Sequence, residues 1–254
     1  MSISVGIDSQ KSNAADAPRT VSGYIRDHLT TAVASVGKWT STFPNDARAR
    51  LAEPALQREI ARLSFIDGYH RIRQTTPLIL AAIATLDQRQ DHDRARCWVK
   101  HLDEEYGHDA SMRRDIVAML GDEIRTVQML AQTSITPPSA ALIGFFEWQV
   151  RNNNPHLLIL LRLFFETFMA ELPEESAAAI HELVPGGSEV VRLHREEDQN
   201  HVGGCYDYLD RNFTEHDLPT LIWTLDFIAL CLTEAQSWIA AQALGRKSPQ
   251  GRNA

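Results

Sequence analysis

Residues 191–210, VRLHREEDQNHVGGCYDYLD, contain the pattern that decides both the fold and the chemistry expected of this chain. They place His194, Asp198 and His201 at positions i, i+4 and i+7. On an α-helix, side chains at these offsets lie along one face, about two turns deep. Two imidazoles and a carboxylate on one helical face are predicted to form half of a metal site.

A second copy of this pattern lies upstream, in residues 100–116, KHLDEEYGHDASMRRDI. There His101, Glu105 and His108 repeat the same spacing. Each copy also contains a shorter motif, in which an acid is followed three positions later by a histidine. Bundles that hold two iron or two manganese ions take such a motif from each of two helices and single carboxylates from others. The two segments are therefore predicted to share one metal centre.

Glu166 is the best candidate for a single carboxylate. It lies in residues 157–172, LLILLRLFFETFMAEL, which are apolar nearly all round and therefore predict a buried helix. A buried carboxylate without a partner is costly, and a cation would remove that cost. The side chain of Arg162, one turn earlier, could pair with Glu166 or reach outward so that its guanidinium lies in water. Pairing with Glu166 is the preferred interpretation.

The candidate ligands also indicate the metals. Imidazole and carboxylate without thiolate suit iron, manganese or zinc. Because about six ligands exceed what one structural zinc takes, two metals are the better count. Two carboxylates able to bridge favour iron or manganese over zinc.

Composition limits the class of protein. A chain of 254 residues with 44% hydrophobic content can build one substantial core, and no segment alternates with period two, so an all-α domain over residues 20–245 is predicted. Residues 1–19 are expected to be a disordered lead-in and residues 246–254 a polar tail. The net charge of −8 and the lack of a basic run argue against a nucleic-acid partner.

Location follows from the cysteines and the apolar segments. Three cysteines without a C-x-x-C pair suggest reduced thiols in a cytoplasmic protein. The N-terminus lacks the basic and apolar regions of a signal peptide. The apolar stretch Leu157–Leu163 is too short to span a bilayer, so no membrane association is expected. Whether the chain forms a homodimer is left open.

Helical periodicity and turn residues predict about seven to nine helices. One covers residues 54–86 with a kink at Pro77, and residues 91–120 form a single helix that carries the upstream motif. The last helix, residues 215–244, is expected to bury four large side chains: Trp223, Phe227, Leu230 and Trp238.

Two further residues on the helix predicted for residues 54–86 have open roles. His70 is interpreted as a satisfied or exposed histidine, with an additional metal ligand or active-site polar group as the alternative. Arg73 is interpreted as a surface arginine, with binding of a substrate carboxylate as the alternative.

Three blocks, in this order, resemble the haem-oxygenase-like iron-containing redox enzymes, which are non-haem di-iron oxidases and oxygenases. The blocks are HLDEEYGHDASMRRDIVAMLG (residues 101–121), NNNPHLLILLRLFFETF (152–168) and VRLHREEDQNHV (191–202). Together they are specific, whereas any one alone would be weak. The resemblance implies a single haem-oxygenase-like helical bundle.

The resemblance also implies two Fe(II) ions, or manganese, held by six ligands: Glu105, His108, Glu166, His194, Asp198 and His201. In some members the first carboxylate stands seven residues before the counterpart of His108. That position is His101 here, so His101, Glu105 or both remain candidates. Other members take a further carboxylate from the preceding long helix, where this chain offers His70.

The activity implied by the resemblance is O2-dependent oxidation of a small molecule, by N-oxygenation, oxidative C–C cleavage or desaturation, with an external electron donor as a further partner. Two alternatives remain. One is a ferritin-like metal-binding protein without an organic substrate. The other is a metal-independent enzyme of the same superfold, of the thiaminase or quinone-cofactor-synthesis type. Haem is a minor alternative, because no glycine-rich distal helix accompanies His70.

Overall fold

The computed structural model describes residues 20–172 and 174–245, and within α9 and α10 it leaves out the side chains of residues 175, 176 and 195–200. All regular structure in the described residues is helical, which confirms the predicted all-α class. The predicted lead-in, residues 1–19, and tail, residues 246–254, lie outside the described residues.

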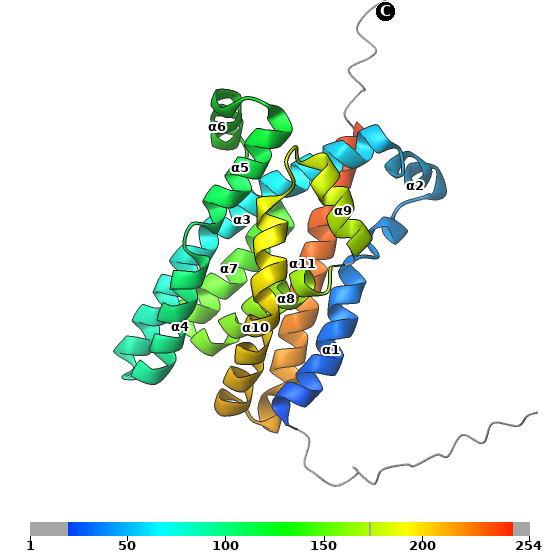
Figure 1. Cartoon of the computed structure of the whole chain (residues 1–254). Coiled ribbons are helices and arrows are strands. Elements are labelled where there is room, and N and C mark those ends of the chain that lie inside the picture. Colours follow the sequence, from blue (N-terminus) through cyan, green and yellow to red (C-terminus); the bar gives the residue numbers. More distant parts are fainter. Residues whose placement is uncertain (1–19, 173, 246–254) are drawn as a thin grey trace, which may run out of the picture.

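Eleven α-helices and three short 3-10 helices make up the described part of the chain (Figure 1). The α-helices are α1 (Val21–Val36), α2 (Asn45–Leu51), α3 (Pro54–Gln88), α4 (His92–Glu105), α5 (His108–Leu120), α6 (Glu123–Gln132), α7 (Pro137–Asn152), α8 (Leu158–Ala170), α9 (Glu174–Leu183), α10 (Glu189–Asn212) and α11 (Leu218–Gly245). The 3-10 helices are η1 (Trp39–Thr42), η2 (Pro155–Leu157) and η3 (Glu215–Asp217).

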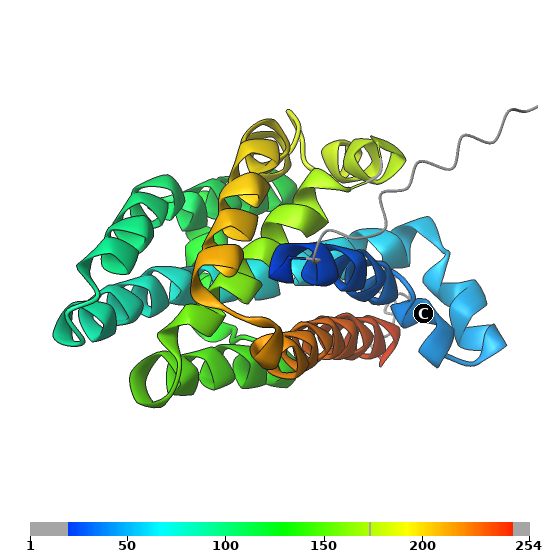
Figure 2. The same ribbon diagram turned by 90° about the horizontal axis from the view of Figure 1, so that it is seen from below.

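Helix α8 occupies the middle of the bundle. It packs against α10 on one side and α11 on another, and α3 packs against α4, α5 and α7 (Figures 1 and 2). Leu160, Leu163 and Phe164 of α8 are fully buried, as expected for a helix that is apolar nearly all round. Glu166 is buried on the same helix, so its carboxylate lies inside the bundle.

The predicted single helix over residues 91–120 is wrong, because the chain forms two helices there. Helix α4 ends at Glu105, Tyr106 is extended, and Gly107 has φ = 96°. Glycine adopts this left-handed conformation without the steric cost that a Cβ brings, and it commonly ends helices. His108 is therefore the first residue of α5. This break and the short α2 bring the helix number above the predicted seven to nine.

The core predicted for the last helix is mostly wrong. Trp223, Leu230 and Trp238 of α11 are about half exposed, and Phe227 is only partly buried. The buried face instead includes Leu221, Leu225, Ile228 and Leu232. Because α11 is apolar around most of its circumference, periodicity does not distinguish its inner face. That face is set by packing against α1, α7 and α3.

One helical stretch in the described residues, Glu215–Gly245, is long and apolar enough to cross a membrane by length and composition. Its most apolar window has a mean hydropathy of 1.4, and 44% of that window is buried inside the protein. A core helix passes the same test.

Helix α3 continues through Pro77 to Gln88, so the proline does not divide this helix into two.

The start of α10 is fixed by a carboxylate from α5. Ser188 caps the helix, as its hydroxyl accepts a hydrogen bond from the Val191 amide at 3.2 Å. Asp115, itself buried, accepts hydrogen bonds from the Ser188 hydroxyl at 2.7 Å and the Glu189 amide at 2.9 Å. This joint sets the direction of the helix that carries His194.

Replacing Asp115 with alanine should therefore destabilise the protein. The substitution leaves buried donors at the start of α10 without an acceptor, which costs about 1–3 kcal/mol in free energy of unfolding. Urea denaturation measures this change, and Asp103→Ala, which removes an exposed carboxylate from α4, is the control. Equal midpoints for Asp115→Ala and Asp103→Ala would show that the joint contributes nothing.

Candidate metal centre

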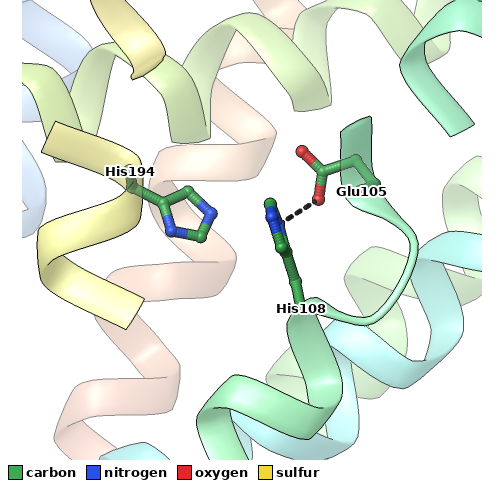
Figure 3. A group of neighbouring side chains, drawn as sticks. All are labelled: Glu105, His108 and His194. Atoms are coloured by element: carbon green, nitrogen blue, oxygen red, sulfur yellow. Dashed lines mark hydrogen bonds and ion pairs between the residues drawn. The ribbon is translucent and has the colours of Figure 1, made fainter. Parts of the chain in front are cut away.

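Glu105, His108 and His194 form the first of two side-chain groups that could hold a metal ion. They come from the end of α4, the start of α5 and α10, and the two rings and the carboxylate converge (Figure 3). One ligand atom from each lies within 4.8 Å of the others. The His108 Nδ1 and Glu105 Oε2 atoms are 3.1 Å apart. The predicted convergence of these three residues is found, although the helix break separates Glu105 from His108.

The orientation of the His194 ring suits metal binding. Its Nδ1 lies 2.9 Å from the carbonyl oxygen of Val190, which can only accept a hydrogen bond. Nδ1 therefore carries the proton, and in the neutral ring the lone pair is on Nε2. Metal-binding histidines are commonly fixed in this way by a backbone carbonyl behind the ring.

The second group consists of His101, Glu105 and Glu166, from α4 and α8, again with ligand atoms within 4.8 Å of one another. Glu105 belongs to both groups. His101 and Glu166 are almost fully buried. The sequence left open whether His101 or Glu105 faces the site. In the structure both side chains face it.

Buried polar atoms without hydrogen bonds are the observation that bears on whether a metal fits here. Among the described residues, His101 Nδ1 and Glu166 Oε2 are buried and have no hydrogen-bond partner. His201 Nδ1 lies 3.3 Å from Glu166 Oε2, but not in hydrogen-bonding geometry. Such orphaned atoms are rare because burying them is costly, and a cation among them would satisfy several at once. The donor set of imidazoles and carboxylates fits that interpretation.

The charge of the carboxylates also suits cation binding. Burial alone would raise the pKa of Glu105, but the hydrogen bond with His108 and the nearby His101, His108 and His194 together lower the pKa to about 2. Glu105 is thus a carboxylate at neutral pH, and no proton must leave it before a cation binds.

Glu104, which was not among the residues predicted for the site, lies beside the second group. Its Oε2 accepts a hydrogen bond from Arg162 at 3.0 Å and lies 3.7 Å from His101 Nδ1. His101, with help from Arg162 and His201, lowers the pKa of Glu104 to about 2. Arg162 also donates from Nε to Glu166 at 3.1 Å, so the predicted pairing of these two residues is found. Glu104 is one residue off the His-x3-acid spacing, which is why that pattern did not select it.

Three described sequence candidates, His70, Arg73 and His201, are not part of either group, although His201 lies beside Glu166. His70 lies instead with its Nε2 2.9 Å from the Thr133 hydroxyl, and burial lowers its pKa. Its interpretation as a satisfied histidine therefore holds. Arg73 stacks over the Tyr69 ring at 5.5 Å, away from the metal centre. The side chain of Asp198 lies outside the described residues, so its role as a ligand stays a prediction.

A cavity of about 170 Å³ opens beside the two groups. His101, Glu105, Glu166 and His194 contribute to its wall. The rest of the wall is mainly apolar and includes Ile72, Ile79, Leu158, Leu161, Phe165 and Phe168. A larger, more polar cavity of about 720 Å³ is lined by Glu104 and His201, and Trp98 and Arg162 belong to the walls of both cavities. The smaller cavity thus adjoins the candidate ligands directly, and the larger one lies behind Trp98 and Arg162.

Comparison with known proteins supports the fold. No family model and no curated protein matches the sequence. A solved structure that resembles the chain is a domain of unknown function with a haem oxygenase-like fold from Shewanella denitrificans OS217. The TM-score is 0.61 and the sequence identity 14%, over 92% of this chain and 95% of that one. The protein therefore has a haem oxygenase-like fold.

Proposed function

We propose that the protein is an O2-activating non-haem di-iron oxidase or oxygenase that acts on a small molecule. The observation that carries the proposal is the position of Glu105 in both groups of candidate ligands. A carboxylate shared in this way can bridge two ions, as in other helical di-iron and di-manganese proteins. The adjacent apolar cavity gives an organic substrate a place next to those ions.

Bound iron would supply the reduction and activation of O2, with electrons from the substrate or an external donor. The side chains have separate tasks. Glu105 and Glu166 provide negative charge against the two cations, and the Val190 carbonyl holds the His194 ring in its ligating orientation. Arg162 positions Glu166 through its Nε hydrogen bond.

The apolar wall has the remaining task of keeping water away from the reacting atoms. Phe165 and Leu161 of α8 and Ile79 of α3 face the cavity that the candidate ligands share. An apolar wall strengthens electrostatic interactions inside the site and limits side reactions with water. The substrate carbon or nitrogen to be oxidised is therefore expected to lie on the side of the metal centre that faces this wall.

Anaerobic titration of the purified protein with Fe(II) tests the proposal, and we expect close to two ions per chain. The six predicted ligands and His101 suffice for two ions, and the helical core should remain folded without metal. Equilibrium dialysis with metal analysis gives the stoichiometry, and circular dichroism checks the fold.

Two outcomes would contradict this proposal. A stoichiometry of zero in a folded protein would favour a metal-independent enzyme of the same superfold. Two bound ions without O2 uptake in the presence of any organic compound from a broad panel would favour a metal-storage protein.

A further inference from the structure

The cavity beside the metal centre contains a second charged feature, the guanidinium of Arg71. This residue lies on α3, and its side chain forms part of the otherwise mainly apolar wall. The other arginine of the wall, Arg162, is already engaged by Glu166 and Glu104. Arg71 is therefore the cationic side chain of the cavity wall whose N–H donors determine which ligand can bind there.

Few of the N–H donors of Arg71 have a hydrogen-bond acceptor within the described residues. Nη1 of Arg71 is 3.4 Å from both Asp67 Oδ2 and the Ser139 hydroxyl, which are long hydrogen bonds. An arginine has five N–H donors, and among the described residues none accepts a hydrogen bond from its Nε or Nη2.

Asp67 is not free to neutralise Arg71 completely. Its Oδ1 accepts from the Thr136 amide and its Oδ2 from the Ser139 hydroxyl, both at 2.7 Å. These short bonds hold Asp67 against the start of α7, where it anchors the chain between α6 and α7. The carboxylate therefore serves a structural joint and offers Arg71 one long contact.

The surroundings of Arg71 make an incomplete ion pair costly. The Phe165 ring lies below the guanidinium, 5.1 Å from Cζ to the ring centroid. Burial lowers the pKa of Arg71, and the charge of Asp67 raises it by a smaller amount. A buried cation with unused donors becomes more stable when an anion binds to it.

We propose that Arg71 binds the carboxylate of the substrate, which makes the substrate of the proposed oxidase a small carboxylic acid with an apolar body. A guanidinium matches a carboxylate because two parallel N–H groups meet two oxygens. The apolar body then lies along the wall formed by Ile79, Leu161 and Phe165, toward the candidate ligands. This inference names the substrate class of the proposed function and rests on it.

Size and charge narrow the class further. A cavity of about 150 Å³ with apolar walls holds a benzene-sized ligand, so about 170 Å³ suits a body of about six carbon atoms. Before metals bind, the carboxylates of Glu105 and Glu166 repel the substrate carboxylate. In the metal-free protein they therefore favour binding of the substrate carboxylate at Arg71.

Ligand binding to three protein forms tests the proposal: wild type, Arg71→Gln and the control Arg73→Gln. Arg73 lies on the same helix, outside this cavity, so the control makes the same change of charge. The probes are butanoate, hexanoate, octanoate and benzoate, with 1-hexanol and benzyl alcohol as neutral partners. Affinities are measured by NMR titration of each protein form in two metal states, metal-free and Zn(II)-loaded. Zn(II) is used in place of iron so that no turnover interferes.

We expect wild type to bind hexanoate or benzoate more tightly than the matching alcohol. Arg71→Gln should weaken binding of the acid about ten- to a hundredfold, the range for hydrogen bonds to charged groups, and leave the alcohol unchanged. Arg73→Gln should behave as wild type. The proposal is overturned if wild type does not prefer the acids, or if Arg71→Gln and Arg73→Gln bind them equally in both metal states.

The same samples separate this proposal from the proposed function. Metal stoichiometry is measured on Arg71→Gln, whose side chain belongs to neither group of candidate ligands, and it should equal that of wild type. Acid binding that depends on Arg71 in a protein without metal affinity would retain the carboxylate site and reject the di-iron function. A protein that binds two metals but does not prefer acids would retain the di-iron function and reject the carboxylate site.

Discussion

Replacing Glu105 with glutamine should remove metal binding from both groups at once. Glu105 supplies a ligand atom to each group, with His108 and His194 in one and His101 and Glu166 in the other. An amide has nearly the same shape but lacks the negative charge that faces the cations. Because loss of a residue that only supports a ligand already costs 10–100-fold in metal affinity, loss of this shared ligand should cost at least about a hundredfold for each ion.

Anaerobic titration with Co(II) measures this effect through the visible absorption of the bound ion, without turnover. Asp103→Asn is the matched control, because it makes the same change of charge two residues away on an exposed side chain. His108→Ala is the contrasting variant, since it touches one group and should weaken one ion more than the other. If Glu105→Gln still bound two ions as wild type does, Glu105 would not be a shared ligand.

The sequence predicted the fold class and the central helix for physical reasons that are easy to follow. The segment around Glu166 is apolar on every side, and only a buried helix can accommodate it. The cap of α10 follows the same kind of local rule, since serine side chains such as that of Ser188 accept hydrogen bonds from the first free amides of a helix. These features depend on local chemistry, which a single sequence contains.

The convergence of the site was predicted for a reason that was partly wrong. The i, i+4, i+7 spacing assumed one helix through His101, Glu105 and His108, but Gly107 ends that helix. His108 still meets Glu105 because α5 begins directly after the break. His101 meets Glu105 in the other group, so Glu105 is the residue that the two histidines share. A glycine in the middle of the pattern was the signal that a break was available.

Features that depend on tertiary packing could not be predicted. The sequence does not show which face of α11 is buried, since Trp223 and Leu225 are equally apolar but only Leu225 lies inside. It also does not show that Arg71, rather than Arg73, reaches the cavity. The two arginines are two positions apart on α3 and therefore point in different directions. The packing of the neighbouring helices around α3 decides which one faces the site.

Replacing Glu166 with glutamine should have opposite effects on the metal-free and metal-loaded protein. Without metal, Glu166 is a buried carboxylate whose Oε1 accepts from Arg162 and whose Oε2 has no hydrogen bond among the described residues. Removing its charge relieves a desolvation cost, and Arg162 keeps its hydrogen bond to Glu104. We expect the Tm of the metal-free variant to equal or exceed that of wild type.

With metal, the same substitution should remove most of the stabilisation that binding provides. An ion present at 100 times its Kd stabilises a folded protein by about 2.7 kcal/mol, which for a chain of this size raises the Tm by about 5–10 °C. The Glu166→Gln variant should lose this shift, because its buried amide cannot balance the charge of the ions. Thermal melts of both proteins with and without Mn(II) measure the difference. A variant with a metal-dependent shift as large as that of wild type would place Glu166 outside the ligand set, and its orphaned oxygen would then need another explanation.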